Sequence, residues 1–246
     1  METNKIYLGN CLELMPEIET GSIDMILCDL PYGTTACKWD TIIPFEPLWE
    51  QYKRIIKPNG SIVLFGAEPF SSALRMSNIK NYKYDWIWDK KKGGNPLLSK
   101  LQPIKNFENI SVFGKGRTVY YPIMVNRDKP KMRGKNKGFL SETTKNCFTE
   151  NKIYTQFYPK AILQISNASQ KDKFHPTQKP VLLMEYLIKT YTIEGELVLD
   201  NCIGSGTTAI ACLNTKRNFI GMEQEQKYFE IANKRIADLQ SQTVLF

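Results

Sequence analysis

Short apolar runs alternate with amphipathic stretches along most of this chain, and that alternation restricts the fold more than any other feature. Residues 25–28 form an apolar run that predicts a buried strand, and residues 45–56 repeat apolar side chains at helical intervals. The same alternation returns after residue 180, with a helix over 181–191 and strands over 196–200 and 218–223. We therefore predict an α/β fold, with a mostly parallel sheet and helices on both faces.

A basic segment separates these two halves. Residues 115–173 contain thirteen Lys and Arg but only four Asp and Glu, so this segment has a net charge of +9. The whole chain has a net charge of +8, so the rest of the chain carries −1. Charge concentrated in one polar segment is typical of a surface that binds a polyanion. We predict one domain formed by residues 1–114 and 174–246, with an inserted region over residues 115–173.

Composition excludes several classes of protein and site. No apolar run approaches the roughly 18 residues of a membrane helix, and the first residues lack the apolar core of a signal peptide. We expect a cytoplasmic protein with no membrane partner. The six cysteines form no CxxC pair and His175 is the one histidine, so we expect no metal ion and no Ser-His-Asp hydrolase.

A glycine turn follows the strand that ends at Asp200. Gly204 and Gly206 allow a tight turn before the next helix, and Glu223 ends the following strand 23 positions after Asp200. An acid before the turn disfavours a pyrophosphate and favours a cationic cofactor such as S-adenosyl-L-methionine. A plain connection between strand and helix is the alternative interpretation of the glycines.

The tetrad "DLPY" stands at the exit of the first buried strand. Together with the downstream "HPTQKP" and "DNCIGSG", it resembles the amino-directed DNA methyltransferases, in the order typical of their circularly permuted β group. The resemblance covers most of the chain outside residues 115–173. It implies a Rossmann-like fold, S-adenosyl-L-methionine as cofactor and double-stranded DNA as substrate, with the insert as target-recognition region.

The tetrad has a chemical rationale. An exocyclic amino nitrogen is a poor nucleophile, so Asp29 and the Leu30 carbonyl would accept its hydrogens as charge develops, while Pro31 stiffens the turn. Tyr32 would stack on a base flipped out of the duplex. The resemblance also implies adenine N6 as the target, because cytosine N4 enzymes of the family more often carry Ser where this chain has Asp29. Cytosine N4, RNA or a protein glutamine as target, and a non-catalytic DNA-binding protein, are alternatives.

The resemblance also implies two sets of binding residues. The cofactor would be held by Asn10, Cys11, Asp29, Thr177, Gln178, Lys179, Asp200, Asn201, Cys202, Gly204, Gly206, Thr207, Thr208 and Glu223. Asn10 replaces the acid usual in the group, and Lys179 would face the carboxylate of the cofactor. DNA would be contacted by Lys90, Lys91, Lys92, Arg117, Arg127, Lys129, Lys131, Arg133, Lys135 and Lys137. A homodimer and a companion restriction nuclease on another chain are further expectations.

Overall fold

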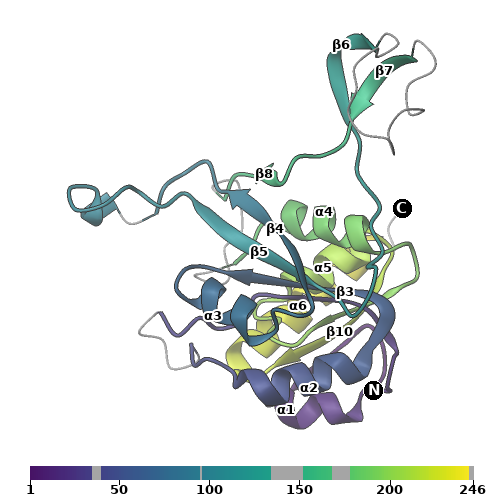
Figure 1. The fold of residues 1–246 in the computed structure, drawn as a ribbon. Helices are drawn as coiled ribbons and strands as arrows, with labels where there is room; N and C mark the ends of the chain where they lie inside the picture. The colour runs from purple at the N-terminus through teal and green to yellow at the C-terminus, as the bar shows by residue number, and fades with distance from the viewer. Residues whose placement is uncertain (35–39, 95, 134–151, 168–177, 244–246) are drawn as a thin grey trace. The chain divides into compact units, whose positions relative to one another are not determined.

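The structure is a computed structural model that describes residues 1–34, 40–94, 96–133, 152–167 and 178–243. Its main feature is an eight-stranded sheet (Figure 1). The strands, in spatial order, are β1 (Lys5–Leu8), β10 (Asn218–Glu223), β9 (Leu197–Asp200), β2 (Ile23–Cys28), β3 (Ile56–Gly66), β5 (Phe107–Phe113), β4 (Tyr82–Asp89) and β8 (Ile162–Gln164). Strand β5 is antiparallel to both neighbours, and the other pairs are parallel. The predicted α/β fold is confirmed.

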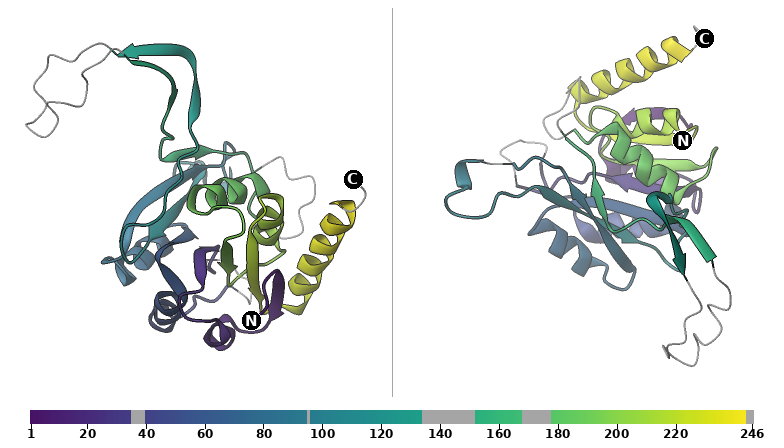
Figure 2. Two further views of the ribbon diagram at one scale, coloured as in Figure 1. Left: turned by 90° about the vertical axis from the view of Figure 1, so that its right-hand side faces the viewer. Right: turned by 90° about the horizontal axis from the view of Figure 1, so that it is seen from above.

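Helices cover both faces of this sheet (Figure 2). The first face carries α1 (Cys11–Leu14), the short 3-10 helix η1 (Met15–Glu17), α2 (Phe45–Ile55) and α3 (Phe70–Ser77). The second face carries α4 (Val181–Tyr191), α5 (Thr207–Asn214) and α6 (Gln226–Thr243). Each set of helices packs its apolar side chains into a separate hydrophobic core. The sheet is therefore the middle of three layers.

Strand β2 shows why its sequence reads as a continuous apolar run. Met25 and Leu27 enter the core beneath α4, α5 and α6, whereas Ile26 and Cys28 enter the core beneath α1, α2 and α3. All four side chains are fully buried, as expected for a parallel strand covered on both faces. On its two edges β2 pairs with β3 and with β9. This strand thus joins the two halves of the chain that the basic segment separates.

The basic segment contributes to two parts of the structure. A second compact unit spans Pro122–Lys160 and contains β6 (Val125–Arg133) paired antiparallel with β7 (Lys152–Phe157). This unit is narrower than the predicted insert over 115–173. Beyond it, β8 adds to the main sheet beside β4, because Leu163 enters a core and Trp88 Nε1 donates to the Ile165 carbonyl at 2.8 Å.

Among the described residues, no helix combines the length and apolar content needed to cross a membrane. Within the same residues, no group of three His, Cys, Asp or Glu side chains is arranged to hold a metal ion. His175 lies outside the part of the chain that the structure describes.

Candidate active site

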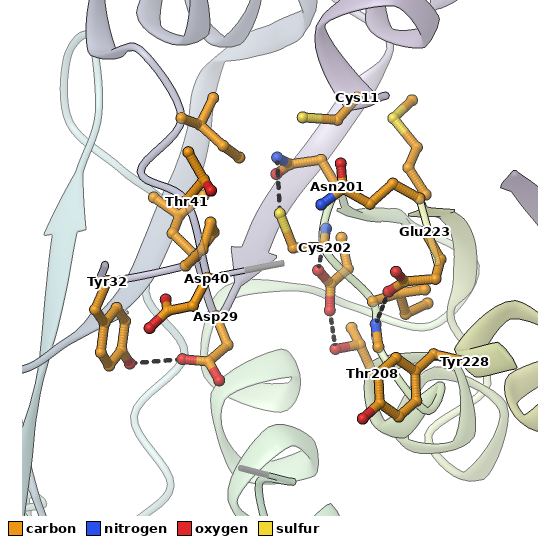
Figure 3. A pocket seen from close by; sticks show the side chains of 18 of the residues that line it. Cys11, Asp29, Tyr32, Asp40, Thr41, Asn201, Cys202, Thr208, Glu223 and Tyr228 are labelled. Carbon is orange, nitrogen blue, oxygen red and sulfur yellow. Dashed lines mark hydrogen bonds between the residues drawn. The ribbon is translucent and has the colours of Figure 1, made fainter. Parts of the chain in front are cut away.

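A pocket of about 330 Å³ lies where the parallel strands end. Asp29 directly follows β2, Asp200 ends β9 and Glu223 ends β10, so three carboxylates meet at one edge of the sheet. Ligands of open α/β sheets bind at this carboxyl edge. Figure 3 shows Asp29 and Tyr32 on one side of the pocket, with Asn201, Thr208 and Glu223 on the other.

Most of the residues predicted to act on the cofactor or the methyl acceptor line this pocket. They are Asn10, Cys11, Asp29, Leu30, Pro31, Tyr32, Gln178, Lys179, Asp200, Asn201, Cys202, Gly204, Thr207, Thr208 and Glu223. Gly206 lies outside the lining, and Thr177 falls outside the described residues. The two distant motifs therefore share one cavity.

The lining also contains residues that the sequence analysis did not assign to the site. The segment 40–44, which leads into α2, forms part of the wall, as do Glu108 on β5, Met184 on α4, and Tyr228 on α6. Apart from Glu108, which lies in the segment "KNFENI" that resembles a strand-entry motif of the family, no motif marks these positions. For Tyr228 the one available signal is its place in the first turn of the helix that follows Glu223.

Asp200 braces the glycine turn. Its Oδ1 accepts the Cys202 N–H at 3.1 Å, and its Oδ2 accepts the hydroxyl of Thr208 (Figure 3). Burial raises the pKa of Asp200 to about 6, although Thr208 and the Cys202 amide oppose the shift. Both carboxylate oxygens of Asp200 therefore accept hydrogen bonds from the turn and the start of the following helix.

Glu223 fixes the other side of the same turn. Its Oε2 accepts the Gly204 N–H at 2.8 Å, and its Oε1 accepts the Glu225 N–H at 2.8 Å. Burial raises the pKa of Glu223, and these two backbone donors partly offset the shift. The carboxylate therefore stands at the wall of the pocket in a fixed orientation.

The two glycines of the turn have different surroundings. Both adopt the left-handed conformation, with φ of +54° at Gly204 and +83° at Gly206. A Cβ on Gly204 would meet no atom within 4 Å, whereas a Cβ on Gly206 would lie 3.0 Å from Ala232 Cβ on α6. Gly204 therefore faces open space in the pocket, and Gly206 allows α6 to pack closely against the turn.

Asn10 and Asn201 both have structural partners. Asn10 Oδ1 accepts the Leu12 N–H at 3.0 Å and so caps α1. Asn201 Oδ1 accepts the hydroxyl of the buried Tyr52 at 2.5 Å. These bonds hold the backbone on either side of the cavity.

The tetrad is held by its own side chains and by a neighbouring acid. Tyr32 Oη donates to Asp29 Oδ1 at 2.6 Å (Figure 3). The Tyr32 ring stacks on Phe70 with centroids 5.1 Å apart. Asp40 accepts the Gly33 and Thr34 N–H groups, each at 2.9 Å. The turn after Asp29 is therefore closed by hydrogen bonds, and one face of the Tyr32 ring is covered.

Lys179 lies between two carboxylates. Its Nζ donates to Asp29 Oδ2 at 2.5 Å and lies 3.4 Å from Glu108 Oε2, although the side chain is only 6% exposed. Burial raises the pKa of Asp29 more than Lys179 lowers it. For Glu108 the balance is reversed, because Lys179 and Lys90 together outweigh burial and lower its pKa. Asp29 and Glu108 outweigh the burial of Lys179 and raise its pKa.

The residues predicted to bind DNA are scattered over both compact units. Lys90 is half-buried, ion-paired with Glu108 and 5.3 Å from the centroid of the Trp88 ring. Lys91, Lys92 and Arg117 are exposed in the first unit. The second unit carries Arg127, Lys129, Lys131 and Arg133 on β6, while Lys135 and Lys137 fall outside the described residues. Their contact with DNA stays a prediction.

The family model for DNA methylases of the N6 and N4 type matches residues 23–234 of this chain. The chain belongs to the N6/N4 DNA methylase family. The match includes both the tetrad and the glycine turn, while Asn10 and Cys11 of the pocket lining precede it. The predicted membership in the β group of amino-directed methyltransferases is confirmed.

Two relatives of this N6/N4 DNA methylase align over nearly its whole length. The Type II methyltransferase M.HinfI of Haemophilus influenzae is 27% identical, over 96% of this chain and 69% of the relative. The Type II methyltransferase M1.MboII of Moraxella bovis is 26% identical, over 95% of this chain and 96% of the relative. The similarity therefore includes the basic segment as well as the catalytic halves.

Solved structures support the same assignment. The complex of M1.HpyAVI with SAM is 26% identical, with a TM-score of 0.64 over 94% of this chain and 98% of that chain. The cytosine-N4-specific PvuII DNA methyltransferase is 18% identical, with a TM-score of 0.68 over 97% of this chain and 91% of that chain. At that identity the second likeness concerns the fold alone, and it agrees with the predicted Rossmann-like architecture.

Proposed function

We propose that this N6/N4 DNA methylase transfers a methyl group to the exocyclic N6 of adenine in double-stranded DNA, after the target base has been flipped out of the helix. The cofactor is S-adenosyl-L-methionine. The observation that carries the proposal is the shared pocket of Asp29 and Gly204. An acceptor for amino hydrogens and the turn proposed to hold the cofactor line one cavity, so one ligand can reach both.

The lining suits a cationic, partly polar cofactor. The pocket volume of about 330 Å³ is in the usual range for small-molecule sites, and space is open in front of Gly204. Asp200 and Glu223 place negative charge at the turn, and Asn10 and Thr207 add polar groups. When bound, S-adenosyl-L-methionine supplies an electrophilic methyl group on a sulfonium.

Asp29 acts on the amino group of the target. Its carboxylate accepts one amino hydrogen, and the Leu30 carbonyl accepts the other. Both hydrogen bonds strengthen as the nitrogen donates its lone pair to the methyl carbon and becomes positively charged, so they favour the transition state over the ground state. The sulfonium would supply the leaving group, taking the electrons of the bond to carbon, and the extra proton on nitrogen would pass to solvent.

Tyr32 provides a surface for the flipped base. Phe70 covers one face of the ring, and the hydroxyl is held by Asp29, so the ring is fixed before the base arrives. Stacking on an aromatic side chain is worth about 1–3 kcal/mol per base, which offsets part of the cost of flipping. Pro31 limits the backbone freedom of the same turn.

The choice of adenine rests on the Asp at the first position of the tetrad, where cytosine N4 enzymes of the family more often carry Ser. Labelled S-adenosyl-L-methionine and duplex DNA, followed by digestion to nucleosides, test it directly. We expect N6-methyladenine. Recovery of N4-methylcytosine would contradict the choice of adenine while preserving the role of Asp29. Loss of labelling of the duplex in competition with structured RNA would instead indicate an RNA substrate.

The basic region over residues 115–173 is proposed to select the DNA sequence. Arg and Lys side chains supply affinity for phosphates, while sequence is read by contacts to base edges. Two of the relatives are Type II methyltransferases, which supports a role beside a restriction nuclease on a separate chain. Direct detection of modified bases in DNA from cells that express the protein would give the target base and its sequence together.

A further inference from the structure

Four charged side chains of alternating sign form a chain at the acceptor end of the pocket. Asp29 follows β2, Lys179 precedes α4, Glu108 lies on β5, and Lys90 follows β4. Each of these groups contacts the next. The cofactor site and the tetrad account for Asp29, but neither of them requires Glu108.

Both oxygens of Asp29 are occupied in this structure. Oδ1 accepts the hydroxyl of Tyr32 at 2.6 Å, and Oδ2 accepts Nζ of Lys179 at 2.5 Å. Each oxygen keeps a second lone pair for an incoming amino group, but an ammonium held on Oδ2 makes the carboxylate a weaker acceptor. Release of Lys179 would therefore strengthen the bond from Asp29 to the amino group of the target.

Glu108 offers the nearest alternative acceptor. Its Oε1 is paired with Lys90, whereas its Oε2 is buried and makes no hydrogen bond with any of the described residues. That Oε2 lies 3.4 Å from Nζ of Lys179, just beyond the usual length for a hydrogen bond between charged groups. A short displacement of Nζ would complete this bond.

We propose that Glu108 is a positioning residue that receives Lys179 when Asp29 accepts the amino group of the target. This inference rests on the proposed function, because it needs an amino group as the acceptor. Lys179 is 6% exposed, so an ammonium that left Asp29 without a new partner would be a buried, unpaired charge, which costs several kcal/mol. Transfer to Glu108 keeps the ammonium paired throughout.

Among the described residues, the surroundings of Lys179 favour a movement between these two acceptors. Nζ lies 5.1 Å from the centroid of the Phe65 ring and 5.8 Å from that of Tyr32, so aromatic faces border its path. The charged or titratable groups that act on Asp29 from its own turn, strand and facing elements are Tyr32, Cys28, Lys179, Glu108 and Asp200. Lys179 is the one cation in that set.

A double-mutant cycle tests the proposal. On the plateau of the pH profile, Glu108→Gln should slow single-turnover methyl transfer by roughly tenfold, because Lys179 loses its charged alternative and stays on Asp29. In a Lys179→Met background the same Glu108 substitution should change the rate by less than about twofold, since Oδ2 is then already free. Equal slowing in both backgrounds would mean that Glu108 serves only the structure, and would overturn the proposal.

A titration of the free protein gives a second readout that does not depend on catalysis. The carbon chemical shift of the Asp29 carboxyl, followed against pH, should report a higher pKa in Lys179→Met and a lower pKa in Glu108→Gln than in the wild type, because Lys179 lowers the pKa of Asp29 and Glu108 raises it. Shifts in the same direction for the two variants would contradict the proposed arrangement.

Asp85→Asn is the matched control. Asp85 pairs with Arg75 at 2.8 Å and has an exposure between those of Glu108 and Asp29. One of its oxygens also lacks a hydrogen bond among the described residues. Asp85 lies outside the pocket lining, so the rate of methyl transfer by Asp85→Asn and the titration of Asp29 in this variant should stay at wild-type values. Nucleoside analysis of the wild type tests the proposed function separately. If the product contains no methylated amine, the proposed function is refuted, and the positioning role of Glu108 is refuted with it. If a methylated amine is found, the double-mutant cycle tests the role of Glu108 alone.

Discussion

Tyr52 on α2 donates a hydrogen bond to Asn201, in the turn after β9, across 149 positions of sequence and a distance of 2.5 Å. Tyr52 is fully buried and Asn201 is 3% exposed, so neither group can exchange this partner for bulk water. The bond connects the half of the chain that contains the tetrad with the half that contains the glycine turn.

Tyr52→Phe should therefore destabilise the protein and weaken cofactor binding. The ring still fills its place in the core, but Asn201 Oδ1 loses its donor, at a cost of about 1–3 kcal/mol. We expect a lower midpoint in urea denaturation and a several-fold higher Kd for S-adenosyl-L-methionine by calorimetry. A variant with unchanged Kd but lower stability would show that Asn201 holds only the fold.

The two glycines of the turn form a matched pair for mutation. Gly206→Ala should reduce the free energy of unfolding by about 2 kcal/mol or more, because the left-handed φ and the contact with Ala232 both oppose a Cβ. Gly204→Ala meets no neighbouring atom, so only the backbone cost of about 1–2 kcal/mol remains. Gly204→Ala should instead show the larger loss of cofactor affinity. Equal effects on stability would contradict the packing described here.

Asp29→Ala should lower methyl transfer by about a thousandfold or more, because it removes an acceptor whose bond strengthens in the transition state. Binding of S-adenosyl-L-methionine and of DNA should stay within a few-fold of the wild type. Single-turnover assays and fluorescence titrations measure the two properties separately, with Asp85→Asn as the control. A catalytically inert DNA-binding protein would instead show the same properties before and after the change.

The stability of the free protein should depend on the protonation of Asp200. Burial raises its pKa to about 6 from the ordinary value of 3.8, so the folded protein binds this proton more tightly than the unfolded chain does. The corresponding stabilisation is fully present below about pH 4 and is lost as the pH rises through 6, at a cost of about 2–3 kcal/mol. Asp200→Asn should remove this part of the pH dependence in chemical denaturation. Parallel curves for the two proteins would contradict the shift.

The exposed cations of β6 should contribute affinity for DNA without sequence preference. Lys129→Ala combined with Lys131→Ala should weaken binding uniformly and reduce the slope of log Kd against log salt by about two. Lys234→Ala, an exposed position on α6, is the control and should leave the slope unchanged. If the double variant keeps the wild-type slope, these lysines do not contact phosphates.

Periodicity predicted most of the fold because local burial decides it. Strand β2 is apolar on both faces and α4 repeats its apolar residues at helical intervals, so both could be identified without any knowledge of their neighbours. Strand β8 could not, because its three residues carry little pattern and depend on pairing with β4. For the same reason the insert was predicted with boundaries wider than the compact unit Pro122–Lys160.

The sequence predicted the motif residues of the site but not the ion pairs between them. Asp29 and Gly204 were identified from the residues around them, and the structure brings both to one pocket. Lys179 has two partners that are distant in sequence: Asp29, which lies 150 positions away, and Glu108 on β5. No spacing rule connects these three positions. Lys90, whose contact with a phosphate stays a prediction, is ion-paired with Glu108 across the hairpin of β4 and β5, and no motif indicates this pair either.

The pairing of β2 with β9 has a consequence during synthesis on the ribosome. Strand β2 is translated early. The elements on the opposite side of the pocket, β9, α5 and β10, are translated near the end of the chain. Domains tend to fold as their segments become available, so the early half must wait with one edge of β2 uncovered. A nascent chain that stops before residue 197 would contain the tetrad but lack the glycine turn and Glu223, so we expect it to be unable to methylate DNA.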